Sequence, residues 1–271
     1  EAECDSLKAL PLKLTYNRVD HKEGMATYFR EYLRGVMTAP KPVKSTYRGW
    51  QMQKYYEDSL AWETNPLYGW CAKNKKKDGT NYNVYTDGLK IYTTLNSHMQ
   101  QYAEEAVEEH LSFLQPLFFK EKVGSKNAPY ARSISAKLVE ELLTKAMKQT
   151  DRYRLMNEAG ASEQEIRKAF DTPQEMTVFS WTGAKDTIMT PMDSIRYYKS
   201  FLRTGFMSMD PLNGHVKAYV GGPNYVYFQY DMAMVGRRQV GSTIKPYLYT
   251  LAMENNFSPC DQVRHVEQTL I

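Results

Sequence analysis

Residues 237–254 read RRQVGSTIKPYLYTLAME, and this stretch carries the clearest indication of both fold and chemistry. Ser242 follows a glycine, and Lys245 and Pro246 come three and four residues later. The apolar residues that follow recur at helical spacing, and a proline is tolerated in the first turn of a helix. The pattern predicts a helix that begins at Ser242 and ends near Asn255.

The position of Ser242 at a helix start gives its hydroxyl group a favourable environment for nucleophilic attack. Unpaired backbone N–H groups and the positive end of the helix dipole would stabilise negative charge that develops on the oxygen. Lys245 lies one turn further along the same face, where a desolvated amine could accept the serine proton. Gly241 removes a side chain just where a substrate backbone would approach.

The same residues also allow a purely structural interpretation. A lone S-x-x-K is a short pattern that occurs by chance in chains of this length. Ser242 would then only cap the helix, and Lys245 would be a solvated residue of the first turn. Spacing and helix position leave both interpretations open.

The residues before this helix predict an antiparallel hairpin. Phe206 to Met209 and His215 to Val220 have strand composition, and the five residues between them include a proline and a glycine that turn the chain. A hairpin followed by a helix gives the last third of the chain an α+β character.

Local patterns predict further elements upstream. Strands are expected at 89–95 and 175–181. Residues 38–86 form a long irregular connection with one short helix, which suits a linker. Further helices are expected at 1–11, at 22–37, from Ser97 with Gln100 at the capping-box spacing, from Ser162 with Glu165 at the same spacing and ending before Pro173, and from Thr190 to Gly205.

The composition excludes several classes of protein. The net charge of +4 is far from the concentrated positive charge of a nucleic-acid binder, and the basic run at 73–77 ends in a turn, as a solvated loop does. Cys4, Cys71 and Cys260 show no C-x-x-C spacing or other metal framework, and an odd number of cysteines cannot all form intramolecular disulfides. No apolar run approaches the ~20 residues of a membrane-spanning helix. The chain opens without methionine, so we expect it to be a piece of a longer protein.

Three separated segments carry a family resemblance. DPLNGHVKAYVGG (210–222) and RRQVGSTIKPYLYTLAME follow the pattern D-P-x-x-G-x-V-x-A and then R-Q-x-G-S-x-x-K-P, and LKIYTTLNSHMQQYAEEAV (89–107) follows T-T-(I/L)-x-x-x-M-Q-x-x-A-E-x-A. These patterns resemble class A penicillin-binding proteins, the bifunctional glycosyltransferase–transpeptidases of the bacterial cell wall. The resemblance covers 89–118 and 206–260 well, the N-terminus moderately, and 38–86 and 119–174 hardly at all.

The resemblance implies an α+β fold with an incomplete β-lactamase/transpeptidase-like domain, in which the serine–lysine helix packs on an antiparallel sheet. A helical and strand-containing connector precedes that domain. Residues 1–37 would be the end of a glycosyltransferase domain and a connecting helix, 38–205 the connector, and 206–271 the N-terminal part of the transpeptidase domain.

The resemblance also implies roles for individual residues. Ser242 matches the acylated nucleophile and Lys245 the partner that manages its proton. Gln239 and Gly241 match substrate-side positions, and these two residues and Pro246 shape the turn. The implied reaction is attack on the carbonyl of a D-Ala-D-Ala stem peptide, loss of the terminal D-alanine, and transfer of the acyl group to a neighbouring stem, with hydrolysis by water as the carboxypeptidase side reaction.

The partners and location that the resemblance implies follow from this reaction. Stem peptides, lipid-linked precursors and β-lactams would bind, other cell-wall synthesis proteins are possible partners, and no nucleic acid, metal or cofactor is implied. The protein would belong to the bacterial inner membrane, with its catalytic part on the periplasmic side.

Two expected family motifs are absent from the end of the chain. The S-x-N and K-(T/S)-G motifs that belong after S-x-x-K do not occur between Lys245 and Ile271. Ser125-Lys126-Asn127 spells S-x-N, but it lies upstream, so we take it as chance. We therefore expect the 271 residues by themselves to be inactive.

Three rival functions remain open. A β-lactamase or β-lactam sensor shares the fold, but it does not carry the T-T-x-x-x-M-Q segment. A non-catalytic scaffold would leave Ser242 idle and dock partners through 38–205. A carbohydrate-binding module is supported only by the 21 tyrosines, which mostly pack in proteins.

Overall fold

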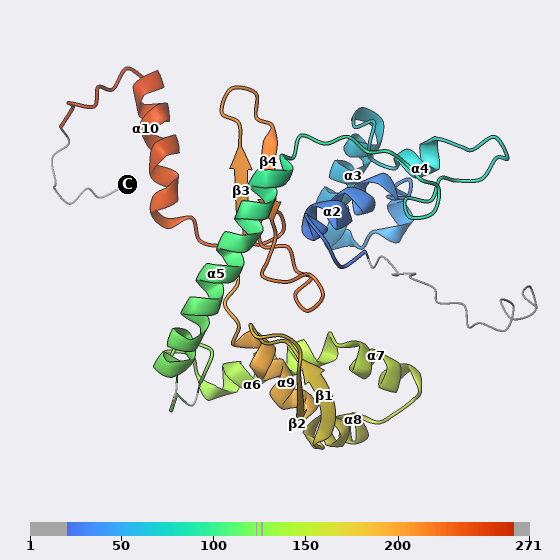
Figure 1. Cartoon of the computed structure of the whole chain (residues 1–271), viewed down its shortest axis with the longest axis vertical. Helices are drawn as coiled ribbons and strands as arrows, with labels where there is room; N and C mark the ends of the chain where they lie inside the picture. The colour runs from blue at the N-terminus through green and yellow to red at the C-terminus, as the bar shows by residue number, and fades with distance from the viewer. Residues whose placement is uncertain (1–20, 123, 126, 263–271) are drawn as a thin grey trace, which may run out of the picture. The chain divides into compact units, whose positions relative to one another are not determined.

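The computed structural model describes residues 21–122, 124–125 and 127–262, which fall into two compact units divided between Val235 and Gly236. The second unit holds the 3₁₀ turn η3 (Gly241–Ile244) and helix α10 (Lys245–Glu254). The elements of the first unit, in chain order, are α2 (Thr27–Met37), the 3₁₀ turns η1 (Lys44–Thr46) and η2 (Gly49–Gln51), α3 (Met52–Thr64), α4 (Trp70–Lys73), α5 (Ser97–Lys122), α6 (Ala136–Lys148), α7 (Asp151–Glu158), α8 (Glu163–Asp171), β1 (Gln174–Val178), β2 (Lys185–Met189), α9 (Pro191–Lys199), β3 (Phe206–Met209) and β4 (Val216–Val220) (Figure 1).

Two antiparallel hairpins and many helices confirm the predicted α+β character of the chain. The predicted hairpin at 206–220 is present, with Phe206 paired to Val220 and Ser208 to Ala218. Gly214 closes its turn with a φ of 71°, a left-handed conformation that glycine adopts without strain. Helix α5 packs on this hairpin, and Ala103 lies against Ala218 and Val220.

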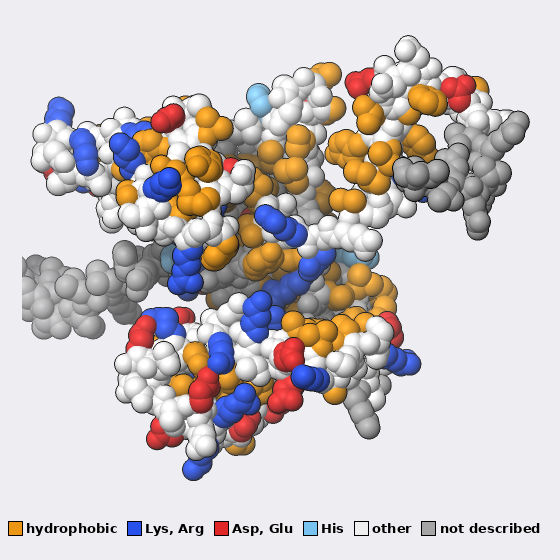
Figure 2. Space-filling model, turned by 180° about the vertical axis from the view of Figure 1, so that it is seen from behind, with side chains coloured by type: hydrophobic (Ala, Val, Ile, Leu, Met, Phe, Trp, Pro, Cys, Tyr) orange, Lys and Arg blue, Asp and Glu red, His pale blue; other side chains and the backbone are white. Residues whose placement is uncertain are grey.

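Helices α6 to α9 and the hairpin β1–β2 form a second group with its own small core. Met147, Ile166 and Phe170 are each about 1% exposed and pack together. The hydroxyl groups of Ser162 and Thr190 cap the helices that follow them, as predicted. Figure 2 shows acidic and basic side chains interspersed over the surface of this group, as on an ordinary solvated face.

An aromatic cluster joins this second group to α5 and to the loop after β4. Phe179, Phe201 and Phe228 are buried, with ring centroids 5.1 to 5.5 Å apart. Phe119 near the end of α5 packs edge-on against Phe201. Such tilted aromatic pairs add to the free energy of burial.

Three predicted elements are wrong, and tertiary contacts explain two of these errors. Residues 89–95 form no strand, although Thr94 Oγ1 donates a hydrogen bond to Val216 O of β4 and the N–H of the next residue but one, Asn96, donates to Lys217 O. Ser97 and Gln100 form no capping box, because Asn96 Oδ1 accepts from Met99 N and Gln100 turns inward. Helix α9 ends at Lys199 instead of reaching Gly205.

Other elements were predicted incompletely. The sequence prediction missed α6, α7 and β2, and residues 38–86 hold more helix than expected, since α3 alone has 13 residues. The predicted helix at 22–37 is confirmed over Thr27–Met37, and the predicted strand at 175–181 is confirmed as β1 over Gln174–Val178. The predicted helix at 1–11 lies outside the described residues.

Candidate active site

The serine–lysine segment lies at a helix start, close to where the sequence predicts it. Ser242 is in the 3₁₀ turn η3, and Lys245 is the first residue of α10. A tight turn of this kind is common at helix N-termini, so the α-helix proper begins three residues later than predicted. Pro246 occupies the first turn of α10, and Gln239 precedes η3 in an irregular stretch.

A backbone hydrogen bond in this turn joins Ser242 and Lys245, but no side-chain hydrogen bond joins them in the described chain. The N–H of Lys245 donates to the carbonyl oxygen of Ser242. Both side chains are exposed, and in the described part of the chain no hydrogen bond joins Ser242 Oγ to Lys245 Nζ. Gly241 has a φ of 53° and open space where a Cβ would stand, so the approach to Ser242 is unobstructed at that position.

Helix α10 leaves its apolar side chains exposed. The exposed fraction is 54% for Leu248, 56% for Leu251 and 52% for Met253. Apolar side chains at this density on a helix normally pack against another element. The turn therefore presents a serine hydroxyl group and a lysine amine three residues apart, and both side chains are exposed in the described part of the chain.

Sequence reasoning missed a buried polar residue in the first unit, Gln100 of α5. Its Oε1 accepts from the backbone N–H of Tyr219 at 2.7 Å, and its Nε2 donates to the carbonyl oxygen of Tyr219 at 2.8 Å. The amide thus pairs with one residue of β4 as a neighbouring strand would. The signal in the sequence was a glutamine on the apolar face of a predicted helix.

A second glutamine of α5, Gln115, also pairs through its side-chain amide with backbone groups of a distant segment. Gln115 is 1% exposed, its Nε2 donates to Ser200 O at 2.9 Å, and its Oε1 accepts from Leu202 N at 2.9 Å. Because Gln115 bonds the backbone just after α9, it holds the chain where that helix ends. Buried amides with full hydrogen bonding fix one arrangement of the backbone around them.

The two glycines after β4 receive the side chain of Tyr28 from α2. A Cβ on Gly221 would lie 2.6 Å from Tyr28 Cδ1, and Gly222 contacts the hydroxyl end of the same ring. Tyr28 Oη donates to Phe228 O at 2.6 Å. Burial raises the pKa of Tyr28 above the usual tyrosine range. The glycine pair therefore joins α2 to the hairpin.

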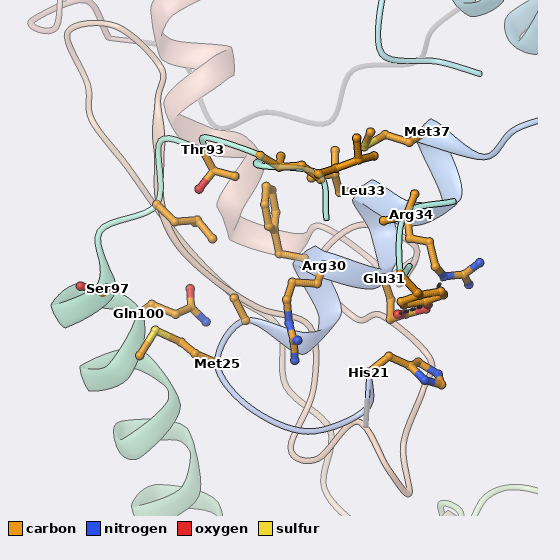
Figure 3. Close-up of a pocket in the computed structure, with 17 residues that line it drawn as sticks. His21, Met25, Arg30, Glu31, Leu33, Arg34, Met37, Thr93, Ser97 and Gln100 are labelled. Atoms are coloured by element: carbon orange, nitrogen blue, oxygen red, sulfur yellow. Dashed lines mark hydrogen bonds and ion pairs between the residues drawn. The ribbon is translucent and has the colours of Figure 1, made fainter. Parts of the chain in front are cut away.

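A hollow of about 850 Å³ lies in the first unit. Figure 3 shows Gln100 of α5 on one side of it and Arg34 of α2 on the other. Two charged side chains in this hollow, Glu31 and Arg34, already pair with each other. Arg34 Nε donates to Glu31 Oε2 at 2.7 Å, and Tyr85 Oη donates to Glu31 Oε1 at 3.0 Å. The hydrogen bond to Glu31 raises the pKa of Arg34.

Metal chemistry has no candidate ligand set in the described residues. No three His, Cys, Asp or Glu side chains there come together in a way that could hold a metal ion.

Comparison with known proteins connects these features to a family. The family model of the penicillin-binding protein middle domain matches residues 125–202, which contain α6 to α9 and the hairpin β1–β2. The chain belongs to the penicillin-binding proteins. The family-model match falls largely on residues where the motif resemblance was weakest, so the two observations complement each other.

Individual penicillin-binding proteins are similar over much of the chain. Penicillin-binding protein 2D of Bacillus subtilis is 29% identical over 168 residues, which is 62% of this chain and 21% of the relative. Penicillin-binding protein 1A of Escherichia coli is 27% identical over 210 residues, 68% of this chain and 25% of the relative. Penicillin-binding protein 1A of Vibrio cholerae is 44% identical over 55 residues, 20% of this chain and 7% of the relative.

The chain thus spans about a fifth to a quarter of the length of the first two of these penicillin-binding proteins. No solved structure matches it. None of the helices in the described part of this penicillin-binding protein is long and apolar enough to cross a membrane.

Proposed function

We propose that this chain contributes the nucleophile of a D,D-transpeptidase that cross-links peptidoglycan stem peptides through an acyl-serine intermediate. The observation that carries the proposal is the single turn that contains Gly241, Ser242 and Lys245 at the start of a helix. Membership of the penicillin-binding proteins supports it, since cell-wall synthesis is the role of that family.

The proposed chemistry assigns one step to each residue. Lys245 Nζ accepts the proton of Ser242 Oγ while that oxygen attacks the carbonyl carbon of the penultimate D-alanine. The C–N bond to the terminal D-alanine then breaks, and its amine leaves with the proton returned by the lysine. The acyl ester on Ser242 is next attacked by an amine of a neighbouring stem, which forms the cross-link and returns the hydroxyl group. Attack by water instead gives hydrolysis.

This chemistry needs more than the exposed turn supplies. A lysine acts as a base when it is desolvated, and oxyanion donors aimed at the reacting carbonyl each contribute ~10²–10³ in rate. The S-x-N and K-(T/S)-G motifs, which would complete such a site, do not occur in residues 246–271. We therefore assign full activity to the whole protein and expect little from these 271 residues.

The whole protein, in this proposal, is a class A enzyme that also carries a glycosyltransferase. Residues 1–37 would end that domain, 38–205 would form the connector, and 206–271 would begin the transpeptidase domain. Its substrates would be lipid-linked precursors and stem peptides, its inhibitors β-lactams, and its location the periplasmic side of the bacterial inner membrane.

Labelling of the full-length protein with a fluorescent penicillin tests the proposal. Wild-type protein should be labelled covalently, Ser242→Ala should remove the label, and Lys245→Gln should slow labelling by at least ~10²-fold. Ser258→Ala, a matched change at another exposed serine of the second unit, should label like wild type. Persistent labelling of Ser242→Ala would show that another residue is the nucleophile, and no labelling of wild type would favour the scaffold alternative.

A further inference from the structure

The net positive charge of the chain is concentrated in residues 38–86. Of the 35 lysines and arginines eight lie there, and of the 31 aspartates and glutamates four, so the rest of the chain is neutral with 27 of each. The same residues include three of the four tryptophans and six of the 21 tyrosines. Proteins place tryptophan and tyrosine at the boundary between membrane and water, where lysine and arginine can meet anionic lipids.

Within this region, the segment KPVKSTYRGW (41–50) carries three cations and no acidic residue. Lys41, Lys44 and Arg48 are exposed, and among the described residues none of the three forms an ion pair. The next cation along the chain, Lys54, is already paired with Asp58 at 3.2 Å. The charges of 41–50 are therefore available to an anionic partner.

Large apolar side chains lie among these cations. The exposed fraction is 79% for Trp50 and 52% for Val43. Tryptophan is highly buried on average, so an indole this exposed indicates a partner outside the described residues. Tyr56 and Leu60, one turn apart on α3, are also exposed. Figure 2 shows Lys and Arg side chains next to hydrophobic ones over the part of the molecule that holds α3 and α4.

The segment is ordered and held against α3. Tyr47 Oη donates to Asp58 Oδ2 at 2.9 Å, and the rings of Tyr47 and Tyr55 pack edge-on with centroids 5.4 Å apart. Lys44 begins the turn η1, and Trp50 lies in the turn η2. The exposed side chains thus project from a fixed backbone, which lowers the entropy cost of binding.

The basic run at 73–77 is less available to a partner. Lys73 Nζ donates to Trp62 O at 2.5 Å, Lys75 Nζ donates to Asn81 Oδ1, and Lys76 pairs with Asp87 at 3.1 Å. Because these lysines bind groups of the chain itself, the uncompensated charge lies mainly in 41–50.

We propose that residues 41–50 are a docking surface for an anionic phospholipid bilayer. Trp50 and Val43 enter the headgroup layer, and the three cations face the lipid phosphates. An indole suits this layer because it has an apolar body and a polar N–H group, and each cation near an anionic surface strengthens binding. The proposed location on the inner membrane keeps this surface near lipid, and to that extent the proposal rests on the proposed function.

The aliphatic side chain in the docking surface favours lipid over a glycan strand. Val43 has no group that can form hydrogen bonds with a sugar, and it gains free energy by leaving water for an apolar layer. A surface of cations with tryptophan and aliphatic side chains is typical of segments that lie on a membrane without crossing it.

Co-sedimentation of the 271-residue chain with lipid vesicles tests the proposal. Vesicles of phosphatidylglycerol mixed with phosphatidylcholine should bind wild type, and vesicles of phosphatidylcholine alone should bind it much more weakly. Lys41→Gln, Lys44→Gln and Arg48→Gln combined should lower binding to the mixed vesicles by ~10²-fold, since each cation contributes about fivefold. Trp50→Ser should lower it by about tenfold.

Matched controls lie elsewhere in the first unit. The combined variant Lys137→Gln, Arg152→Gln and Lys185→Gln removes three exposed cations that form no ion pair among the described residues. Leu212→Ser removes an apolar side chain that is 95% exposed. Both controls should bind like wild type. The exposed apolar side chains of α10 are present in every variant, so differences between variants report on the substituted residues.

Tryptophan fluorescence tests whether Trp50 itself enters the lipid. Mixed vesicles should shift the wild-type emission to shorter wavelength, because the exposed indole leaves water. Trp50→Phe should show no such shift, since Trp62, Trp70 and Trp181 are already partly buried.

Two results would overturn the proposal. One is equal binding of the mixed vesicles by the docking-surface variants and the controls. The other is binding to isolated peptidoglycan but not to vesicles, lost in Trp50→Ser, which would assign the surface to a glycan. Vesicle binding does not involve acylation of Ser242, so this proposal and the transpeptidase proposal fail in separate experiments.

Discussion

At the scale of single residues, the glycine pair after β4 lets two distant parts of the chain pack closely, because neither glycine carries a side chain. Gly221 and Gly222 are buried under the ring of Tyr28, which comes from nearly 200 residues earlier. The backbone of Tyr28 is part of α2, so the ring has little freedom to move away from the two glycines. A side chain at either glycine would separate α2 from the hairpin.

Gly221→Ala should lower the free energy of unfolding by about 1–3 kcal/mol, the usual cost of overpacking a core. The added methyl group would lie 2.6 Å from Tyr28 Cδ1 and 2.7 Å from Asp231 Oδ1. Gly35→Ala is the control, because nothing lies within 4 Å of that position in α2, and alanine favours a helix by about 0.5–1 kcal/mol over glycine. Equal stability of the two variants in urea unfolding would contradict this packing.

The buried hydroxyl group of Tyr28 makes stability depend on alkaline pH. Burial raises the pKa of Tyr28 in the folded protein above that of the unfolded chain, so the folded state keeps a proton that the unfolded state loses. Tyr28 therefore contributes fully below about pH 10, and its contribution is lost as pH rises further. Above that pH, the unfolding free energy should fall about 1.4 kcal/mol per pH unit less steeply in Tyr28→Phe than in wild type.

Tyr92→Phe is the control for this measurement, since Tyr92 is 91% exposed and its ring meets water in both states. Urea unfolding between about pH 9 and pH 11 gives the slopes. Identical slopes in wild type and Tyr28→Phe would mean that the hydroxyl group reaches solvent.

At the scale of elements, helix starts in the α6–α9 group are set by local hydrogen bonds. Ser162 Oγ accepts from Glu165 N, and Glu165 Oε2 accepts from Ser162 N at 2.8 Å. The backbone N–H and the hydroxyl group of Ser162 both donate to this carboxylate at 2.8 Å, and these two hydrogen bonds lower the pKa of Glu165. Because both partners lie within one turn, the sequence alone was sufficient to locate this helix start.

Ser162→Ala should destabilise the protein by about 1 kcal/mol, the typical value of a lost N-cap. Ser112→Ala is a suitable control, since the Ser112 hydroxyl only bonds Glu109 O within its own exposed turn of α5. Thermal unfolding of the two variants gives the comparison, and a Ser162→Ala midpoint equal to that of Ser112→Ala would argue against the capping box.

At the scale of the whole molecule, the boundary between the two units lies at Val235 and Gly236. Residues 236–240 have no regular structure, and Arg237 and Arg238 are exposed. The second unit contributes no buried side chain among its described residues. We expect the stretch at 236–240, which precedes the turn with Ser242, to be open to a protease.

Brief trypsin digestion of the 271-residue chain should cut after Arg237 or Arg238 before it cuts α2 at Arg30 or Arg34, because a protease needs an extended, accessible backbone. Mass spectrometry identifies the fragments. The double variant Arg237→Gln with Arg238→Gln should delay release of the C-terminal piece. Simultaneous cleavage in α2 and at 237–238 would contradict the division into units.

The sequence by itself determined the features that depend on neighbours along the chain. The hairpin at 206–220, the caps at Ser162 and Thr190, and the helix start near Ser242 all rest on contacts within a few residues. The motifs at 89–107, 210–222 and 237–254 also indicated the family, because such motifs are read directly along the chain.

Only the tertiary structure decided what Gln100 and residues 89–95 do. Gln100 has the spacing of a capping box with Ser97, yet its partner, Tyr219, lies 119 residues away. Residues 89–95 have strand composition, but the amide of Gln100 already occupies the edge of β4 at Tyr219, so no ladder forms there. A sequence pattern reports local preference, whereas a buried hydrogen bond between distant segments depends on which backbone groups the fold leaves unpaired.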